Sequence, residues 1–179
     1  GSDVAVAESL TTDPRVDMVT FTGSTPTGRR IMAAASATVK KVFLELGGKS
    51  AFIVLDDADL GLSAMLAGFT ICSHAGQGCA ITTRLLVPAS KYDEAVEQTA
   101  AIMAGVPYGD PTDPGMMMGP LVSEAQRQKV DAYVQSAVDE GGTVVLGGKV
   151  PEHLPDGFFY EPTLISGLGP DAKINQEEV

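Results

Sequence analysis

Positive charge is scarce in this sequence of 179 residues, which has 12 Lys and Arg against 23 Asp and Glu and a formal net charge of −11. Such a balance opposes nonspecific binding to nucleic acid or to an anionic membrane surface, and no basic run offsets it. The sequence also lacks a signal-peptide pattern and an apolar stretch long enough to span a bilayer. We therefore expect a cytoplasmic protein with no nucleic-acid and no membrane partner.

Cysteine is scarce as well, because Cys72 and Cys79 are the only two. They lie too close in the sequence for a disulfide between them to stabilise the fold, and neither belongs to a C-x-x-C pattern of the kind that binds metals. We interpret both as thiols and predict no metal site. The carboxylates of Asp56, Asp57 and Asp59 precede a helical pattern, and we expect them to cap that helix rather than to bind a metal ion.

Apolar periodicity predicts strands over residues 16–21, 42–46, 51–55, 84–87, 143–146 and 158–165, the last interrupted by Pro162. Helical spacing predicts one helix that starts near Pro26 and others over residues 62–72, 92–102 and 130–138. Residues 105–120 are rich in proline and glycine and are predicted to form a surface loop. Strands and helices that alternate in this way indicate an α/β fold with a largely parallel sheet flanked by helices.

One predicted helix carries a stripe of large apolar side chains, which we expect to be buried in the core. The stripe consists of Leu62, Met65, Leu66, Phe69 and Cys72.

Cys79 is the candidate nucleophile. It lies in the small-residue loop Gly76-Gln77-Gly78-Cys79, where the flanking glycines let backbone approach a ligand and no bulky neighbour shields the sulfur. The alternative is a small buried cysteine that packs as a weak hydrophobe.

Glu45 is the candidate base. In the predicted strand over residues 42–46, period two places Val42, Leu44 and Leu46 on one face and Phe43 with Glu45 on the other. A carboxylate in an apolar run, just before a glycine pair, is costly to bury unless it has a charged or hydrogen-bonding partner or a chemical role. The alternative is a glutamate on an edge strand that faces water.

A strand-turn-helix begins with residues 16–21 and turns at Gly23 and Ser24, before Pro26 at the start of a helix. Ser24 or Thr25 is expected to cap the helix, and the amide groups at its start form a site for an anion such as a nucleotide phosphate. The alternative is a plain capped helix without a ligand.

Three motifs together resemble the aldehyde dehydrogenase superfamily in order and spacing. They are Phe21-Thr22-Gly23-Ser24-Thr25, Leu44-Glu45-Leu46-Gly47-Gly48-Lys49 and Gly76-Gln77-Gly78-Cys79. Glu45 and Cys79 are 34 positions apart, a separation similar to that of the family's base and nucleophile, and Gln176-Glu177-Glu178-Val179 resembles the start of its cofactor-ribose motif.

The resemblance implies an NAD- or NADP-dependent oxidation of a small-molecule aldehyde to a carboxylic acid. In this scheme Cys79 attacks the carbonyl to form a thiohemiacetal, a thioester follows, and Glu45 activates the water that releases the acid. Gly23 and Ser24 would face the cofactor pyrophosphate, Glu178 would bind the nicotinamide ribose, and Leu46 would also contact the cofactor.

The resemblance further implies that residues 1–46 are the tail of a nucleotide-binding domain and that residues 47–179 are a catalytic domain, incomplete at its C-terminal end. We therefore expect the chain to be an inactive fragment of a longer enzyme that is a homo-oligomer. Two alternatives stay open. Cys79 and Glu45 would also suit a thiol esterase or acyl transferase without redox chemistry, and the fold would also suit a catalytically silent scaffold.

Overall fold

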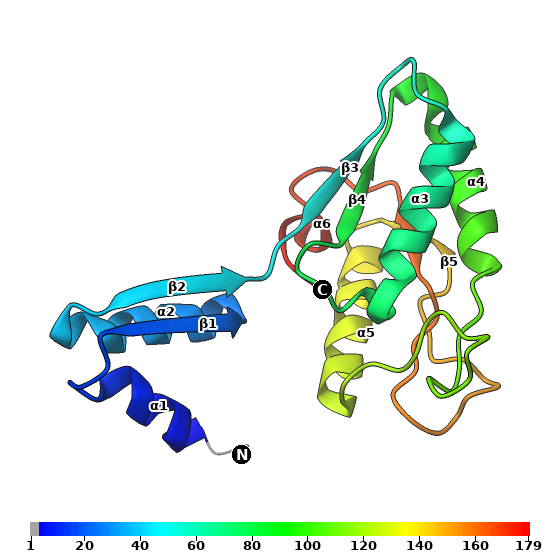
Figure 1. Cartoon of the computed structure of the whole chain (residues 1–179). Helices are drawn as coiled ribbons and strands as arrows, with labels where there is room; N and C mark the ends of the chain where they lie inside the picture. The colour runs from blue at the N-terminus through cyan, green and yellow to red at the C-terminus, as the bar shows by residue number, and fades with distance from the viewer. Residues whose placement is uncertain (1–3) are drawn as a thin grey trace. The chain divides into compact units, whose positions relative to one another are not determined.

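The computed structural model describes residues 4–179. These residues fold into two compact units, one that ends at Gly47 and one that runs from Gly48 to Val179 (Figure 1). Each unit has its own strands and helices and is described by itself.

The first unit is a strand-helix-strand element preceded by a helix. Its elements are α1 (Val4–Thr12), β1 (Met18–Gly23), α2 (Thr25–Ala35), the 3₁₀ turn η1 (Ser36–Thr38) and β2 (Lys41–Leu46). β1 and β2 pair in parallel, and α2 is the crossover that such pairing requires. The predicted strand-turn-helix is therefore confirmed.

Alternation along β2 sets the core of the first unit. Leu44 and Leu46 are partly buried while Phe43 and Glu45 are exposed, as period two predicts. Leu44 and Leu46 face α2, where the helix has Gly28: a Cβ at that position would lie 2.9 Å from Leu46 Cδ2. The missing side chain of Gly28 thus lets α2 lie close to the sheet.

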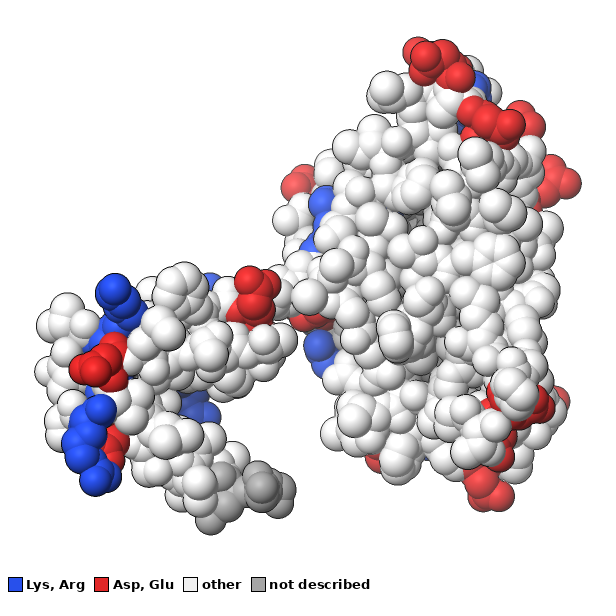
Figure 2. Space-filling model, viewed as in Figure 1, with Lys and Arg blue, Asp and Glu red and all other residues white. Residues whose placement is uncertain are grey.

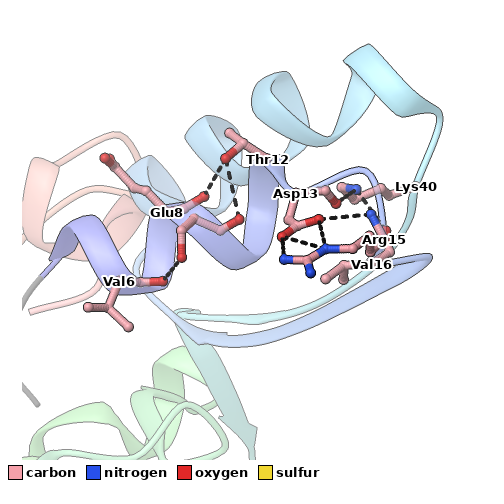
Figure 3. A network of polar contacts seen from close by, with 8 residues as sticks. Val6, Glu8, Thr12, Asp13, Arg15, Val16 and Lys40 are labelled. Atoms are coloured by element: carbon pink, nitrogen blue, oxygen red, sulfur yellow. Dashed lines mark hydrogen bonds and ion pairs between the residues drawn. The ribbon is translucent and has the colours of Figure 1, made fainter.

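A network of polar contacts fixes the turn between α1 and β1 (Figure 3). The Nζ atom of the buried Lys40 donates to the carbonyl oxygens of Asp13 at 2.6 Å and Val16 at 2.7 Å. Arg15 pairs with the Asp13 carboxylate at 2.6 Å, and this hydrogen bonding lowers the pKa of Asp13. These two hydrogen bonds compensate the Lys40 amine for the contacts with water that it loses on burial.

The second unit contains two further pairs of strands. Its elements are β3 (Ser50–Ile53), α3 (Leu60–Cys72), η2 (Ser73–Gly76), β4 (Thr82–Leu86), η3 (Ala89–Lys91), α4 (Tyr92–Ala104), α5 (Glu124–Asp139), β5 (Thr143–Leu146), β6 (Leu164–Ser166) and α6 (Lys173–Gln176). β3 pairs with β4 in parallel, whereas β5 and β6 are antiparallel.

The α/β class is confirmed, with a sheet that is divided into pairs. Two of the three strand pairs in residues 4–179 are parallel. The predicted strand over residues 158–165 is shorter than expected, since β6 begins only at Leu164. Pro162 has no N–H to donate to a neighbouring strand, which explains why pairing starts after it.

The buried face of α3 is not the predicted stripe. α3 packs against α4 through small residues, because Ala64, Ala67 and Gly68 are buried and a Cβ at Gly68 would lie 2.9 Å from Ile102 Cγ2. Cys72 is buried as expected, at 2% exposure. The other members of the stripe are exposed by 37% or more: Leu62, Met65, Leu66 and Phe69. The expectation that they form the core was wrong.

The loop that follows α4 contributes to the core, which corrects the expectation of a surface loop. Val106 and Met118 are buried beside Cys72 and Met103 in one cluster. Leu121, Val134 and Tyr160 form a second cluster, which α5 covers. The three consecutive methionines therefore include a core residue, Met118, at 5% exposure.

Charge is unevenly spread over the surface of the second unit. Figure 2 shows acidic side chains mainly toward its two ends, with an expanse of uncharged surface between them on the visible face. Within residues 4–179, no helix is both long and apolar enough to cross a membrane.

Candidate active site

One edge of the first unit gathers four of the predicted site residues. The register of the parallel pair places Thr22 beside Glu45 and Gly23 beside Leu46. Both strands therefore end at the same edge, and Ser24 follows there as the N-cap of α2, with its hydroxyl accepting from the Thr27 amide at 3.5 Å. Gly23, Ser24, Glu45 and Leu46 are thus neighbours at this edge.

The start of α2 offers hydroxyl groups and no negative charge to a phosphate group. Its first turn contains no acidic residue, and the Ser24 and Thr27 hydroxyls lie 3.0 Å apart. The Thr27 amide donates to the Ser24 hydroxyl and the Gly28 amide to the Ser24 carbonyl. Gly23 cannot be replaced without movement, because a Cβ there would collide with the Phe21 ring. The residues that were predicted to face a pyrophosphate are therefore compatible with one.

Leu46 and Glu45 point to opposite faces of the β1–β2 pair. The Leu46 side chain packs against Gly28 of α2, and Leu46 is partly exposed. Glu45, the next residue back, lies on the face away from α2 and is exposed. The Glu45 carboxylate therefore faces water, as in the alternative interpretation of this residue.

Cys79 lies in the second unit and is exposed, whereas Cys72 is buried. The exposure of Cys79 contradicts the alternative in which it packs as a buried hydrophobe. Burial raises the pKa of the Cys72 thiol to about 11, so this thiol is a poor nucleophile near neutral pH. Of the two thiols, Cys79 is therefore the one placed for chemistry.

Gln77 is a residue of this loop to which the sequence analysis gave no role. Its side-chain amide donates to the His74 carbonyl at 3.1 Å, and its Oε1 accepts from the Val122 amide at 2.9 Å. The two segments border an open hollow of about 850 Å³. His74 and Ala75 have φ of 50° and 54°, so the backbone before Cys79 is in a conformation that is costly for residues other than glycine. Gln77 helps to hold that conformation.

The sequence pattern also assigns no chemical role to Lys49, which is half-buried. Burial and the charge of Arg84 together lower its pKa to about 8, and the charge of Glu178 opposes this shift. The residue before Lys49 lies beside Cys79, since a Cβ at Gly48 would be 3.7 Å from the Cys79 carbonyl oxygen.

The described part of the chain contains no group of three or more His, Cys, Asp and Glu side chains that could hold a metal ion.

Solved structures of aldehyde dehydrogenases share this fold. An aldehyde dehydrogenase from Mycobacterium tuberculosis, complexed with NAD⁺, is 43% identical with a TM-score of 0.91, over 94% of this chain and 35% of that one. Aldehyde dehydrogenase C from Pseudomonas syringae, as a C291A mutant with NAD⁺ and octanal, is 32% identical with a TM-score of 0.94, over 97% of this chain and 36% of that one.

The sequence model described as "Aldehyde dehydrogenase family" matches residues 1–179, and the chain belongs to this family. Betaine aldehyde dehydrogenase 1 of Oryza sativa subsp. japonica is 42% identical over 95% of the chain and 34% of that protein. Betaine aldehyde dehydrogenase of Bacillus subtilis (strain 168) is 40% identical over 100% of the chain and 37% of that protein. The chain thus spans about a third of the length of these relatives.

Proposed function

We propose that the full-length protein oxidises an aldehyde to a carboxylic acid with NAD or NADP. The observation that carries the proposal is the exposed thiol of Cys79 in a glycine-rich loop, within a chain that belongs to the aldehyde dehydrogenase family. Relatives named betaine and aminoaldehyde dehydrogenases favour an aldehyde with an amino or ammonium group as the substrate class.

The proposed chemistry begins at Cys79. Its thiolate attacks the aldehyde carbonyl and forms a thiohemiacetal, while the Cys79 backbone amide is one donor to the oxygen that becomes negative. A bound NAD or NADP supplies the oxidising power by accepting hydride, which leaves a thioester on Cys79. Glu45 then takes a proton from a water molecule that attacks the thioester, and the carboxylic acid is released.

The cofactor residues are part of the same proposal. Gly23 and Ser24 would hold the pyrophosphate at the start of α2, Leu46 would also contact the cofactor, and Glu178 would bind the nicotinamide ribose. The absence of acidic side chains from the first turn of α2 supports the first of these assignments.

We also propose that residues 1–46 belong to the nucleotide-binding domain and residues 47–179 to the catalytic domain. The division into compact units after Gly47 supports this boundary. Because the chain spans about a third of its relatives, we propose that it does not oxidise aldehydes by itself. The cytoplasmic location and the homo-oligomeric state stay predictions.

The test is a panel of aldehydes with both cofactors on the full-length protein and on two variants. Cys79→Ala is expected to lower turnover by at least about a thousandfold, since nothing replaces the nucleophile. Cys72→Ala is the matched control: it removes a buried sulfur, should cost about 1 kcal/mol of stability and should keep turnover. Turnover near the wild-type level in the Cys79 variant, at equal folded fraction, would refute the proposal.

A further inference from the structure

The segment that carries Glu178 is held by α5 through Tyr133. The Tyr133 hydroxyl donates to Oε2 of Glu177 at 2.6 Å. The Nζ atoms of Lys129 and Lys173 lie 5.6 Å and 5.0 Å from the centroid of its ring. Tyr133 is itself 9% exposed, so the hydroxyl is held in a defined place. A short hydrogen bond to a carboxylate is among the stronger contacts that a tyrosine makes.

The extended backbone at Glu177 relates the direction of the Glu177 side chain to that of Glu178. Glu177 is extended, with φ of −112° and ψ of 152°, and successive side chains on an extended backbone point to opposite sides. When Glu177 points to Tyr133, the Glu178 side chain leaves the backbone on the opposite side. The charge of Glu178 acts on both Lys49 and the Tyr133 hydroxyl, and it raises the pKa of each.

We propose that Tyr133 is a positioning residue of the cofactor-ribose site, because its hydrogen bond to Glu177 fixes the direction in which Glu178 points. This inference rests on the proposed function, in which Glu178 binds the nicotinamide ribose. Two further contacts restrain the backbone alone: Lys129 Nζ donates to the Glu178 carbonyl at 3.3 Å and Gln126 Nε2 to the Val179 carbonyl at 3.2 Å. Neither selects which side chain faces the site.

A second tyrosine that bonds to a carboxylate, Tyr160, provides a matched control; its partner Asp131 lies on α5. Tyr160 donates its hydroxyl to Oδ1 of Asp131 at 2.9 Å, so it also pairs with a carboxylate of the second unit. It packs with Leu121 and Val134, away from the segment of residues 177–179. Tyr160→Phe therefore removes the same kind of hydrogen bond without releasing Glu177.

The experiment compares Tyr133→Phe and Tyr160→Phe in the full-length protein by two measurements. Hydrogen exchange at the amides of residues 177–179 is expected to rise about tenfold in Tyr133→Phe and to stay within about twofold in Tyr160→Phe, since one hydrogen bond to a charged group is lost from the segment. The Kd for NAD⁺ or NADP⁺, by calorimetry, should rise about tenfold in Tyr133→Phe only. The KM for the aldehyde should not change.

Variants of Glu177 give a second, independent reading if the Tyr133 variant is poorly folded. Glu177→Gln keeps an acceptor for the Tyr133 hydroxyl and should stay near the wild type, whereas Glu177→Ala should match Tyr133→Phe in both measurements. Unchanged exchange in Tyr133→Phe, or equal effects of the two tyrosine variants, would overturn the inference.

Glu178→Gln separates this inference from the proposed function. If Glu178→Gln weakens cofactor binding while Tyr133→Phe does not, the positioning role of Tyr133 is wrong and the ribose role of Glu178 stands. If Glu178→Gln leaves cofactor binding unchanged while Tyr133→Phe still raises exchange, the ribose role is wrong and the anchoring of the segment by Tyr133 stands.

Discussion

Cys72 and Cys79 differ in exposure, one of the properties that decide whether a thiol reacts. Cys79 is exposed, whereas Cys72 is buried with a pKa raised to about 11. The sequence could separate the two, because Cys72 follows helical spacing and Cys79 lies among glycines. It could not reveal Gln77 as the link between the nucleophile loop and Val122, since that contact joins segments 45 positions apart.

The role of Glu45 makes a prediction for Glu45→Gln in the full-length protein. An amide keeps the shape of the side chain but cannot take a proton, so release of the acid should slow by about a hundredfold or more while thioester formation continues. The acyl adduct on Cys79 should accumulate and be visible by mass spectrometry after mixing with aldehyde and cofactor. Turnover at the wild-type rate with no adduct would remove Glu45 from this role.

At the scale of elements, strands were easier to predict than the packing of α3. The alternation of residues in β2 correctly predicts which face of the strand is partly buried and which is exposed. In α3, apolar residues occur on all sides, so spacing alone selects no face. The contact with α4 selects the small residues, since they allow the two helices to approach closely.

This packing predicts opposite effects for two glycine substitutions within α3. Gly68→Ala would place a Cβ 2.9 Å from Ile102 Cγ2, an atom next to the backbone that has little room to move. The strain of about 1 to 3 kcal/mol exceeds the gain in helix propensity of about 1 kcal/mol, so a net loss of stability is expected. Gly61→Ala, whose Cβ would be 3.4 Å from its nearest neighbour, should be neutral or stabilising.

Urea unfolding of the 179-residue chain measures both effects. A Gly68→Ala protein as stable as the Gly61→Ala protein would show that α3 and α4 are not in close contact.

At the scale of the whole molecule, the chain divides into two compact units after Gly47, and the domain boundary after residue 46 stays a prediction. The sequence contains a cue for it, the glycine pair Gly47-Gly48 after a strand. It contains no comparable cue for the separation of the strands into three pairs, which depends on contacts between distant segments.

The half-buried Lys49 couples the stability of the chain to pH. Its folded-state pKa of about 8 lies below the ordinary 10.5, so the unfolded chain binds more protons between these values and stability rises with pH there. The lowered pKa of Lys49 reduces the free energy of unfolding by up to about 3 kcal/mol at pH 7. At pH 9 this reduction is smaller by about 1 kcal/mol. Above pH 9 the raised pKa of Cys72 works in the opposite direction.

Lys49→Met should therefore be more stable than the wild type at pH 7 by about 1 to 3 kcal/mol, and this advantage should shrink by about 1 kcal/mol at pH 9. Urea unfolding of both chains at the two pH values checks it. An advantage that does not change with pH would mean that Lys49 is not charged and buried in the folded chain.

The burial of Lys40 separates it chemically from its neighbour Lys41, which is exposed. Its amine is bonded to two carbonyl oxygens, so an acylating reagent reaches it only when the turn between α1 and β1 opens. Lys40 then serves as an internal probe of this opening, and the exposed Lys41 serves as its reference. The ratio of their acetylation rates reports how often the first unit opens, without any introduced label.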